Sequence, residues 1–209
     1  MKLSLIIGLL GITCGVTSSF GQGSVFLDNY NTDGPVVTYG SGGIPANGVS
    51  GASGAVGTGL QAGWTLGFYF VVGNATINSD PTGGADPTSL GGGLTLATGS
   101  GSTAAFFTSS FGTPGEVLAG SGFAVPGTAI AGGDTITLMA VAYNGASYVS
   151  STARAHSAAF TMVTSANNSA SPNKIGSFMP GFAIVVPEPS ITALAGLSGA
   201  AFVFLRRRK

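Results

Sequence analysis

Short apolar runs separated by Gly, Pro, Asn and Ser fill the chain between about residues 22 and 184. The longest are 64–72 and 135–143. Side chains of a strand alternate between its two faces, so Ile136, Leu138, Ala140 and Ala142 share one face of the second run. Met139, Val141 and Tyr143 then share the opposite face with Thr135 and Thr137. Both faces of both runs are largely apolar, which predicts two central strands buried on both sides.

Shorter strands are predicted around these two, and no segment has convincing helical periodicity. The shorter candidates are 24–27, 36–39, 94–97, 104–108, 158–163 and 182–185. Residues 40–63 and 82–101 are rich in Gly and Ser and are predicted to be loops. Short strands with frequent turn signals indicate an all-β fold, an antiparallel β-sandwich with Gly/Ser-rich loops. The sandwich domain is predicted to span 22–164, and residues 165–186 to form a loop, a last strand and a stalk.

The first 21 residues have the three parts of a secretory signal peptide. Lys2 is followed by an apolar stretch at 3–12 and by small residues at Ser19 and Gly21. About ten apolar residues are too few to span a bilayer. We expect export through the Sec machinery and cleavage by signal peptidase after Gly21, although a cut after Gln22 or Gly23 would also fit. The segment could instead be a retained anchor, a buried helix, or a lipoprotein leader lipidated at Cys14.

A second uncharged apolar segment, 190–205, lies near the end of the chain and is predicted to form a single transmembrane helix. Arg206, Arg207, Arg208 and Lys209 follow it and would stay on the cytoplasmic side as a basic stop. The sequence Pro187-Glu188-Pro189 would then stand at the outer face of the inner membrane. Proline disfavours helix at and before its own position, so this tripeptide is expected to be extended and accessible.

Val186-Pro187-Glu188-Pro189-Ser190, the apolar segment and the basic end together resemble the PEP-CTERM sorting signal. Exosortases, membrane-embedded cysteine transpeptidase-like proteases of Gram-negative bacteria, recognise that signal. The resemblance covers residues 187–209. It implies export, transient anchoring in the inner membrane and cutting near 187–189, followed by delivery to the cell surface or extracellular matrix. The alternative is a tail-anchored protein with a chance Pro-Glu-Pro.

Charge is scarce, at 7% of residues, and is unevenly placed. Between the two terminal segments Arg154 and Lys174 are the only bases. The acids there are Asp28, Asp33, Asp80, Asp86, Glu116 and Asp134. A mildly acidic middle argues against a nucleic-acid partner, which needs a basic surface. The only cysteine, Cys14, leaves with the leader, so the mature chain would have neither disulfides nor a thiolate site.

No constellation of catalytic or metal-binding residues is evident. His156 is the only histidine and has no potential ligands near it in sequence, and no Gly-x-Ser-x-Gly elbow is present. Asp28, Asp33, Asp80 and Asp86 are conceivable calcium ligands. Asp80, Asp86, Glu116 and Asp134 are conceivable members of a glycosidase pair. These acids are instead expected in solvated turns, so no catalytic residue, metal or cofactor is predicted, and the chain is not expected to be an enzyme.

The aromatic residues suggest a second function. Trp64 is the candidate for stacking on sugars, together with Tyr30, Tyr39, Tyr143 and Tyr148. The leading hypothesis is an exported surface or matrix protein with a non-enzymatic structural or adhesive body. The alternative is a carbohydrate-binding module for exopolysaccharide, and a hydrolase that depends on His156 is a third class.

Overall fold

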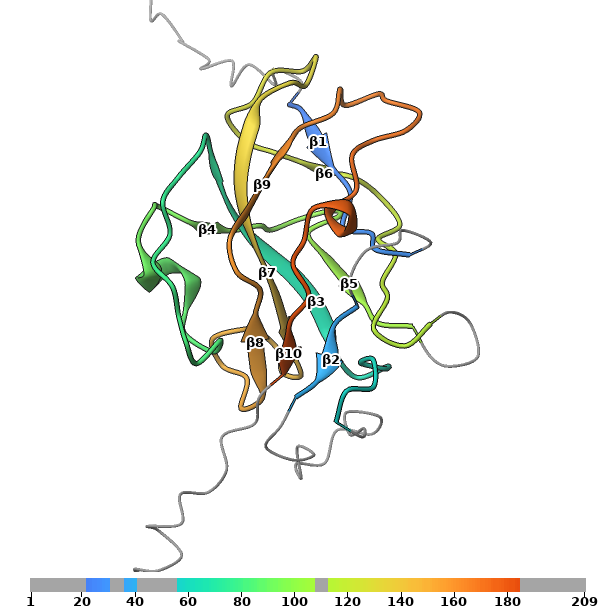
Figure 1. The fold of residues 1–209 in the computed structure, drawn as a ribbon. Coiled ribbons are helices and arrows are strands. Elements are labelled where there is room, and N and C mark those ends of the chain that lie inside the picture. Colours follow the sequence, from blue (N-terminus) through green and yellow to red (C-terminus); the bar gives the residue numbers. More distant parts are fainter. Residues whose placement is uncertain (1–21, 31–35, 41–55, 108–112, 185–209) are drawn as a thin grey trace, which may run out of the picture.

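The computed structural model describes residues 22–30, 36–40, 56–107 and 113–184. These residues form a mostly β structure (Figure 1). Its only helices, in the part described, are two short 3₁₀ helices, η1 (Pro87–Leu90) and η2 (Ile175–Ser177). The absence of helical periodicity in the sequence therefore agrees with the fold.

A six-stranded antiparallel sheet forms the centre of the molecule. Its strands are β3 (Thr65–Val72), β4 (Thr95–Leu96), β5 (Thr103–Ala105), β7 (Thr135–Tyr143), β8 (Arg154–His156) and β9 (Phe160–Val163). β3 and β7 pair along their length, from Thr65 opposite Tyr143 to Val72 opposite Ile136. β4 and β5 pair with the other edge of β3, and β8 and β9 pair with the other edge of β7.

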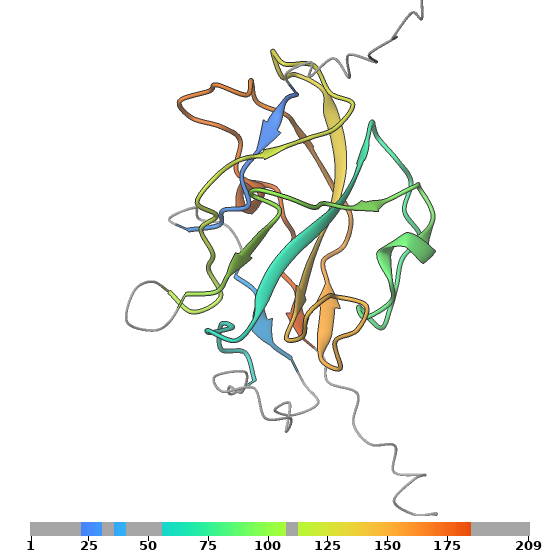
Figure 2. The same ribbon diagram turned by 180° about the vertical axis from the view of Figure 1, so that it is seen from behind.

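Two small sheets lie against this central sheet. β1 (Ser24–Val25) pairs antiparallel with β6 (Phe123–Ala124), and β2 (Thr38–Tyr39) pairs parallel with β10 (Ala183–Ile184). Figures 1 and 2 place the two pairs toward opposite ends of the central strands. The predicted β fold with antiparallel sheets is confirmed. The parallel β2–β10 pair is a departure, allowed because these strands are far apart in the chain and no short hairpin has to join them.

The central sheet is covered on both faces, as the alternation of its strands predicted. Leu66 and Phe68 of β3 and Leu138 of β7 belong to the larger core cluster, together with Val25 of β1 and Ile184 of β10. The opposite face carries a smaller core, formed by Tyr69, Leu90, Leu94, Met139, Val141, Tyr143 and Tyr148. Residues 73–94 and 144–153 cover this second face; we call them the 73–94 loop and the 144–153 loop.

Each predicted strand overlaps an observed one. The prediction 135–143 coincides with β7, and 64–72 begins one residue before β3. The shorter predictions correspond to strands of two to four residues. β6 and β8 were not predicted, because Phe123–Ala124 and Arg154–His156 are too short to show an alternation of apolar and polar residues. Within 165–184, Ile175, Met179 and Ile184 join the larger core, so this segment packs with the body up to β10.

The two predicted terminal segments, the signal peptide at 1–21 and the transmembrane helix at 190–205, lie outside the described residues. So does the predicted sorting motif at 187–189. Among the described residues, no helix has the length and apolar character needed to cross a membrane.

Candidate functional site

The most deeply buried titratable pair of the described body joins Asp80 of the 73–94 loop to His156 of β8. Nε2 of His156 lies 3.0 Å from Oδ2 of Asp80, and their side chains are 4% and 7% exposed. Oδ1 of Asp80 accepts hydrogen bonds from the amide and hydroxyl of Thr82, and Oδ2 accepts one from the Ala85 amide. Four donors therefore converge on one carboxylate.

These contacts set the pKa of Asp80. Burial alone would raise the pKa of Asp80, but the hydrogen bonds from Thr82, Ala85 and His156 outweigh it and hold that pKa well below its usual range. Nδ1 of His156 lies 2.8 Å from the carbonyl oxygen of Ser157, which can only accept. Both ring nitrogens of His156 therefore face oxygen atoms of the protein, Nε2 the Asp80 carboxylate and Nδ1 the Ser157 carbonyl.

This arrangement differs from a Ser-His-Asp triad. In a triad one ring nitrogen binds the carboxylate and the other accepts the proton of the serine hydroxyl. Here the second nitrogen lies against a backbone carbonyl oxygen, that of Ser157, and not against a serine hydroxyl. The neighbouring hydroxyl, Oγ of Ser157, donates to the Ala158 carbonyl and accepts from the Ala140 amide. A hollow of about 320 Å³ lies beside the pair, and both ring nitrogens of His156 are engaged in contacts within the protein.

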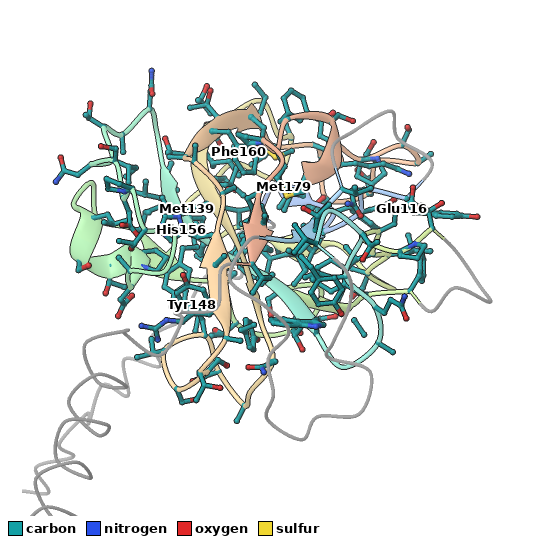
Figure 3. The ribbon with its side chains drawn as sticks, turned by 60° about the horizontal axis from the view of Figure 1, so that its bottom comes forward. Glu116, Met139, Tyr148, His156, Phe160 and Met179 are labelled. Atoms are coloured by element: carbon teal, nitrogen blue, oxygen red, sulfur yellow. The ribbon has the colours of Figure 1, made fainter. Side chains whose placement is uncertain are left out.

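The other acids do not converge. Asp28 forms an ion pair with Lys174, with 2.6 Å between Oδ2 and Nζ, and Asp86 caps η1 through the Thr88 amide. Glu116 and Asp134 accept backbone amides of their own turns. Figure 3 places Glu116 and His156 on opposite sides of the molecule. Asp33 lies outside the described residues, and within them no group of three His, Cys, Asp or Glu residues can hold a metal.

Trp64, the candidate for sugar stacking, lies in the larger core. Its side chain is 1% exposed, and its Nε1 donates to the hydroxyl of Tyr39, 3.2 Å away. Tyr39 meets its ring edge to face, with 6.0 Å between the centroids. Tyr143 and Tyr148 are also buried. Stacking needs an accessible ring face, so this structure offers no sugar platform at Trp64; strand aromatics of this chain fill the core instead.

Sequence reasoning missed a second group of contacts, centred on Arg154. Nε of Arg154 donates to the Gly84 carbonyl at 3.0 Å, and Nη1 donates to the carbonyls of Tyr148 and Val149. The guanidinium carbon stands 5.2 Å from the centroid of the Tyr148 ring. The Tyr148 hydroxyl donates to the Ala85 carbonyl, and burial raises the pKa of Tyr148 well above its usual range. Arg154 thus joins the 73–94 and 144–153 loops.

No local sequence signal marks these contacts, because they join residues far apart in the chain. Asp80 and His156 are separated by 76 positions, and Arg154 and Gly84 by 70. The sequence offered one hint of these contacts, the scarcity of ionisable residues around them. Between Asp134 and Lys174, Arg154 and His156 are the only Asp, Glu, Lys, Arg or His residues, and they stand two positions apart. Such residues at alternate positions of a strand point to the same face.

The part of the sequence that matches a known protein family directly follows β10 along the chain. A family model described as the PEP-CTERM protein-sorting motif matches residues 185–209. The chain carries a PEP-CTERM sorting motif at its C-terminus. The resemblance drawn from Pro187-Glu188-Pro189, the apolar segment and the basic end is therefore confirmed. No curated protein and no solved structure matches the chain.

The PEP-CTERM motif identifies an exported, membrane-sorted protein that is processed by an exosortase. It begins at residue 185, one position after the end of β10 at Ile184. Ile184 is 2% exposed and its carbonyl accepts the Gly40 amide at 2.8 Å. The packed body therefore extends to the very edge of the sorting motif.

Proposed function

We propose that residues 22–184 are a non-enzymatic structural or adhesive body, delivered to the cell surface or extracellular matrix. The signal peptide would be removed after Gly21 following Sec export. The segment 190–205 would then hold the chain in the inner membrane of a Gram-negative cell until an exosortase cuts near 187–189. The match of the PEP-CTERM motif to 185–209 carries this proposal.

The polar groups of the body support the non-enzymatic part of the proposal. Both ring nitrogens of His156 and both carboxylate oxygens of Asp80 are used in internal contacts. A general base must have a free position that reaches the substrate proton. The pair is better suited to holding the 73–94 loop on the sheet, which is a structural role.

The arrangement of layers supports a finer description of the fold. We propose that the body is a β-sandwich in which the central sheet forms one layer. The β1–β6 and β2–β10 pairs would form the other layer, with the larger core between them. Two aligned layers with a shared apolar interior are the defining feature of this architecture.

The two glutamates of the chain allow a matched test of sorting. Glu188 lies in the motif, and Glu116 lies on a turn of the body. We expect Glu188→Ala to leave the tail uncut, so that the protein stays in the membrane fraction at full mature mass. Glu116→Ala should be processed like the wild type. Immunoblots of membrane and extracellular fractions from the native host measure both, and normal processing of Glu188→Ala would contradict the proposal.

A further inference from the structure

An open hollow of about 760 Å³ lies between the 73–94 and 144–153 loops. Its volume falls within the range of about 300–1,000 Å³ that is typical of small-molecule sites. Its lining includes Pro81, Thr82, Ala85, Val149, Thr152 and Arg154. Side-chain hydroxyls, exposed apolar carbons and one cation therefore share a single concave surface.

Arg154 is held rigidly at this hollow. A guanidinium has five N–H bonds, and three of those of Arg154 point to the carbonyls of Gly84, Tyr148 and Val149. The Tyr148 ring packs against it. Because these contacts already fix the guanidinium group of Arg154, the side chain would lose little conformational entropy when a ligand binds.

The charge of Arg154 has no internal partner among the described residues. The ion pairs of the described body are His156–Asp80 and Lys174–Asp28, and neither involves Arg154. The two N–H bonds of its Nη2 make no hydrogen bond with any described residue. The carboxylates on the same loop serve other groups, Asp80 binding His156 and Asp86 capping η1. A positioned cation with free donors at a hollow is suited to an anionic group.

The rest of the lining defines the kind of molecule that would carry the anion. Thr152 offers a hydroxyl, and the hydroxyl of Thr82, which donates to Asp80, can still accept. Pro81 and Val149 offer exposed apolar carbons. A sugar presents the complementary groups, hydroxyls around its edge and C–H bonds on its faces. We propose that the hollow at Arg154 binds a carboxylated sugar, a uronic acid unit of a polysaccharide. The inference concerns the body alone and does not depend on how the chain is delivered.

Calorimetric titration of the full chain in detergent micelles tests the site. The probes are tri-galacturonic acid and its fully methyl-esterified form, which has the same sugar rings without the charge. We expect the acid to bind at least about tenfold more tightly than the ester, because a charge-assisted hydrogen bond is lost in the ester. Raising the salt concentration should weaken binding of the acid.

Two variants place the site at the hollow. Arg154→Gln should remove the preference for the acid. Since this change also removes loop contacts, Thr152→Trp serves as a second variant: Thr152 is exposed and the larger side chain would fill the hollow without breaking a described contact. It should abolish binding while leaving the melting temperature unchanged.

Three results would overturn the proposal. The first is acid and ester binding equally well, and the second is no binding of the acid at a dissociation constant below about 1 mM. The third is inorganic phosphate binding as tightly as the trisaccharide, which would mean a general anion site. None of these results would affect the sorting test at Glu188, so the proposal of exosortase sorting and the proposal of sugar binding are tested independently.

Discussion

Asp80 and His156 connect the 73–94 loop to β8, and their contacts extend to the backbone on both sides. The His156 amide donates to the Gly83 carbonyl at 2.8 Å, beside the Asp80–His156 pair itself. Removing one partner of a buried pair leaves an uncompensated charge in the protein, which costs more than the pair contributes by its presence. The loop and the strand are therefore coupled through these two residues.

We expect Asp80→Asn to lower the free energy of unfolding at neutral pH by about 3–5 kcal/mol, the usual cost of breaking a buried pair. Asp86→Asn is the matched control on the same loop, because asparagine caps a helix about as well as aspartate and the cost should be small. Urea denaturation of both variants measures the difference. Equal free energies of unfolding for the two variants would contradict a stabilising role of the Asp80–His156 pair.

The depressed pKa of Asp80 also predicts an acid sensitivity. A carboxylate whose folded pKa lies below its unfolded value stabilises the fold fully above the unfolded pKa, about 3.9. That contribution is lost as the pH falls toward the folded pKa. The free energy of unfolding should therefore decline below about pH 4 in the wild type and decline less steeply in Asp80→Asn. Parallel declines in urea titrations from pH 5 downward would be the contrary result.

At the scale of elements, the two long strands both contribute to the larger core, β3 through Leu66, Phe68 and Phe70 and β7 through Ile136, Leu138, Ala140 and Ala142. Their alternation was visible in the sequence. Leu138 of β7 is fully buried, whereas Val163 of β9 is 42% exposed although both belong to the same sheet. β8 could not be recognised, because what buries its Ala155 and His156 is the packing of loops and strands distant in the chain. Strand prediction succeeded where a strand provides its own apolar pattern.

We expect Leu138→Ala to destabilise the body by about 2–5 kcal/mol, since a buried leucine truncated to alanine leaves a cavity. Val163→Ala should change the free energy of unfolding by less than about 0.5 kcal/mol, as is usual for exposed positions. Denaturant midpoints and slopes of the two variants provide the comparison. Similar losses at both positions would mean that β7 is not the central strand.

At the scale of the whole molecule, the packed body and the sorting motif are nearly contiguous. β10 ends at Ile184 and Pro187 is three residues further on. Five residues lie between Ile184 and Ser190, so six residue-to-residue steps join them, and a fully extended chain of six steps spans about 20 Å. With the predicted helix beginning at 190, the body would remain within that distance of the membrane until the tail is cut.

The sequence predicted the sorting motif and the β class of the body well, because each depends on a local pattern: three adjacent parts for the motif, and alternation for the strands. The candidate sites in the body were not predictable in this way. Trp64 was chosen for its chemistry, and only the fold shows that it is buried against Tyr39. Arg154 and His156 acquire their partners only when distant loops meet.

The most direct test of the central claim is the intact mass of the protein recovered from the surface or medium of its native host. We expect a product that begins near Gln22 and ends near Pro187 to Pro189, with both terminal segments removed. A recovered protein that still carries Arg206 to Lys209 would show that the tail is a permanent anchor, and would contradict processing by an exosortase.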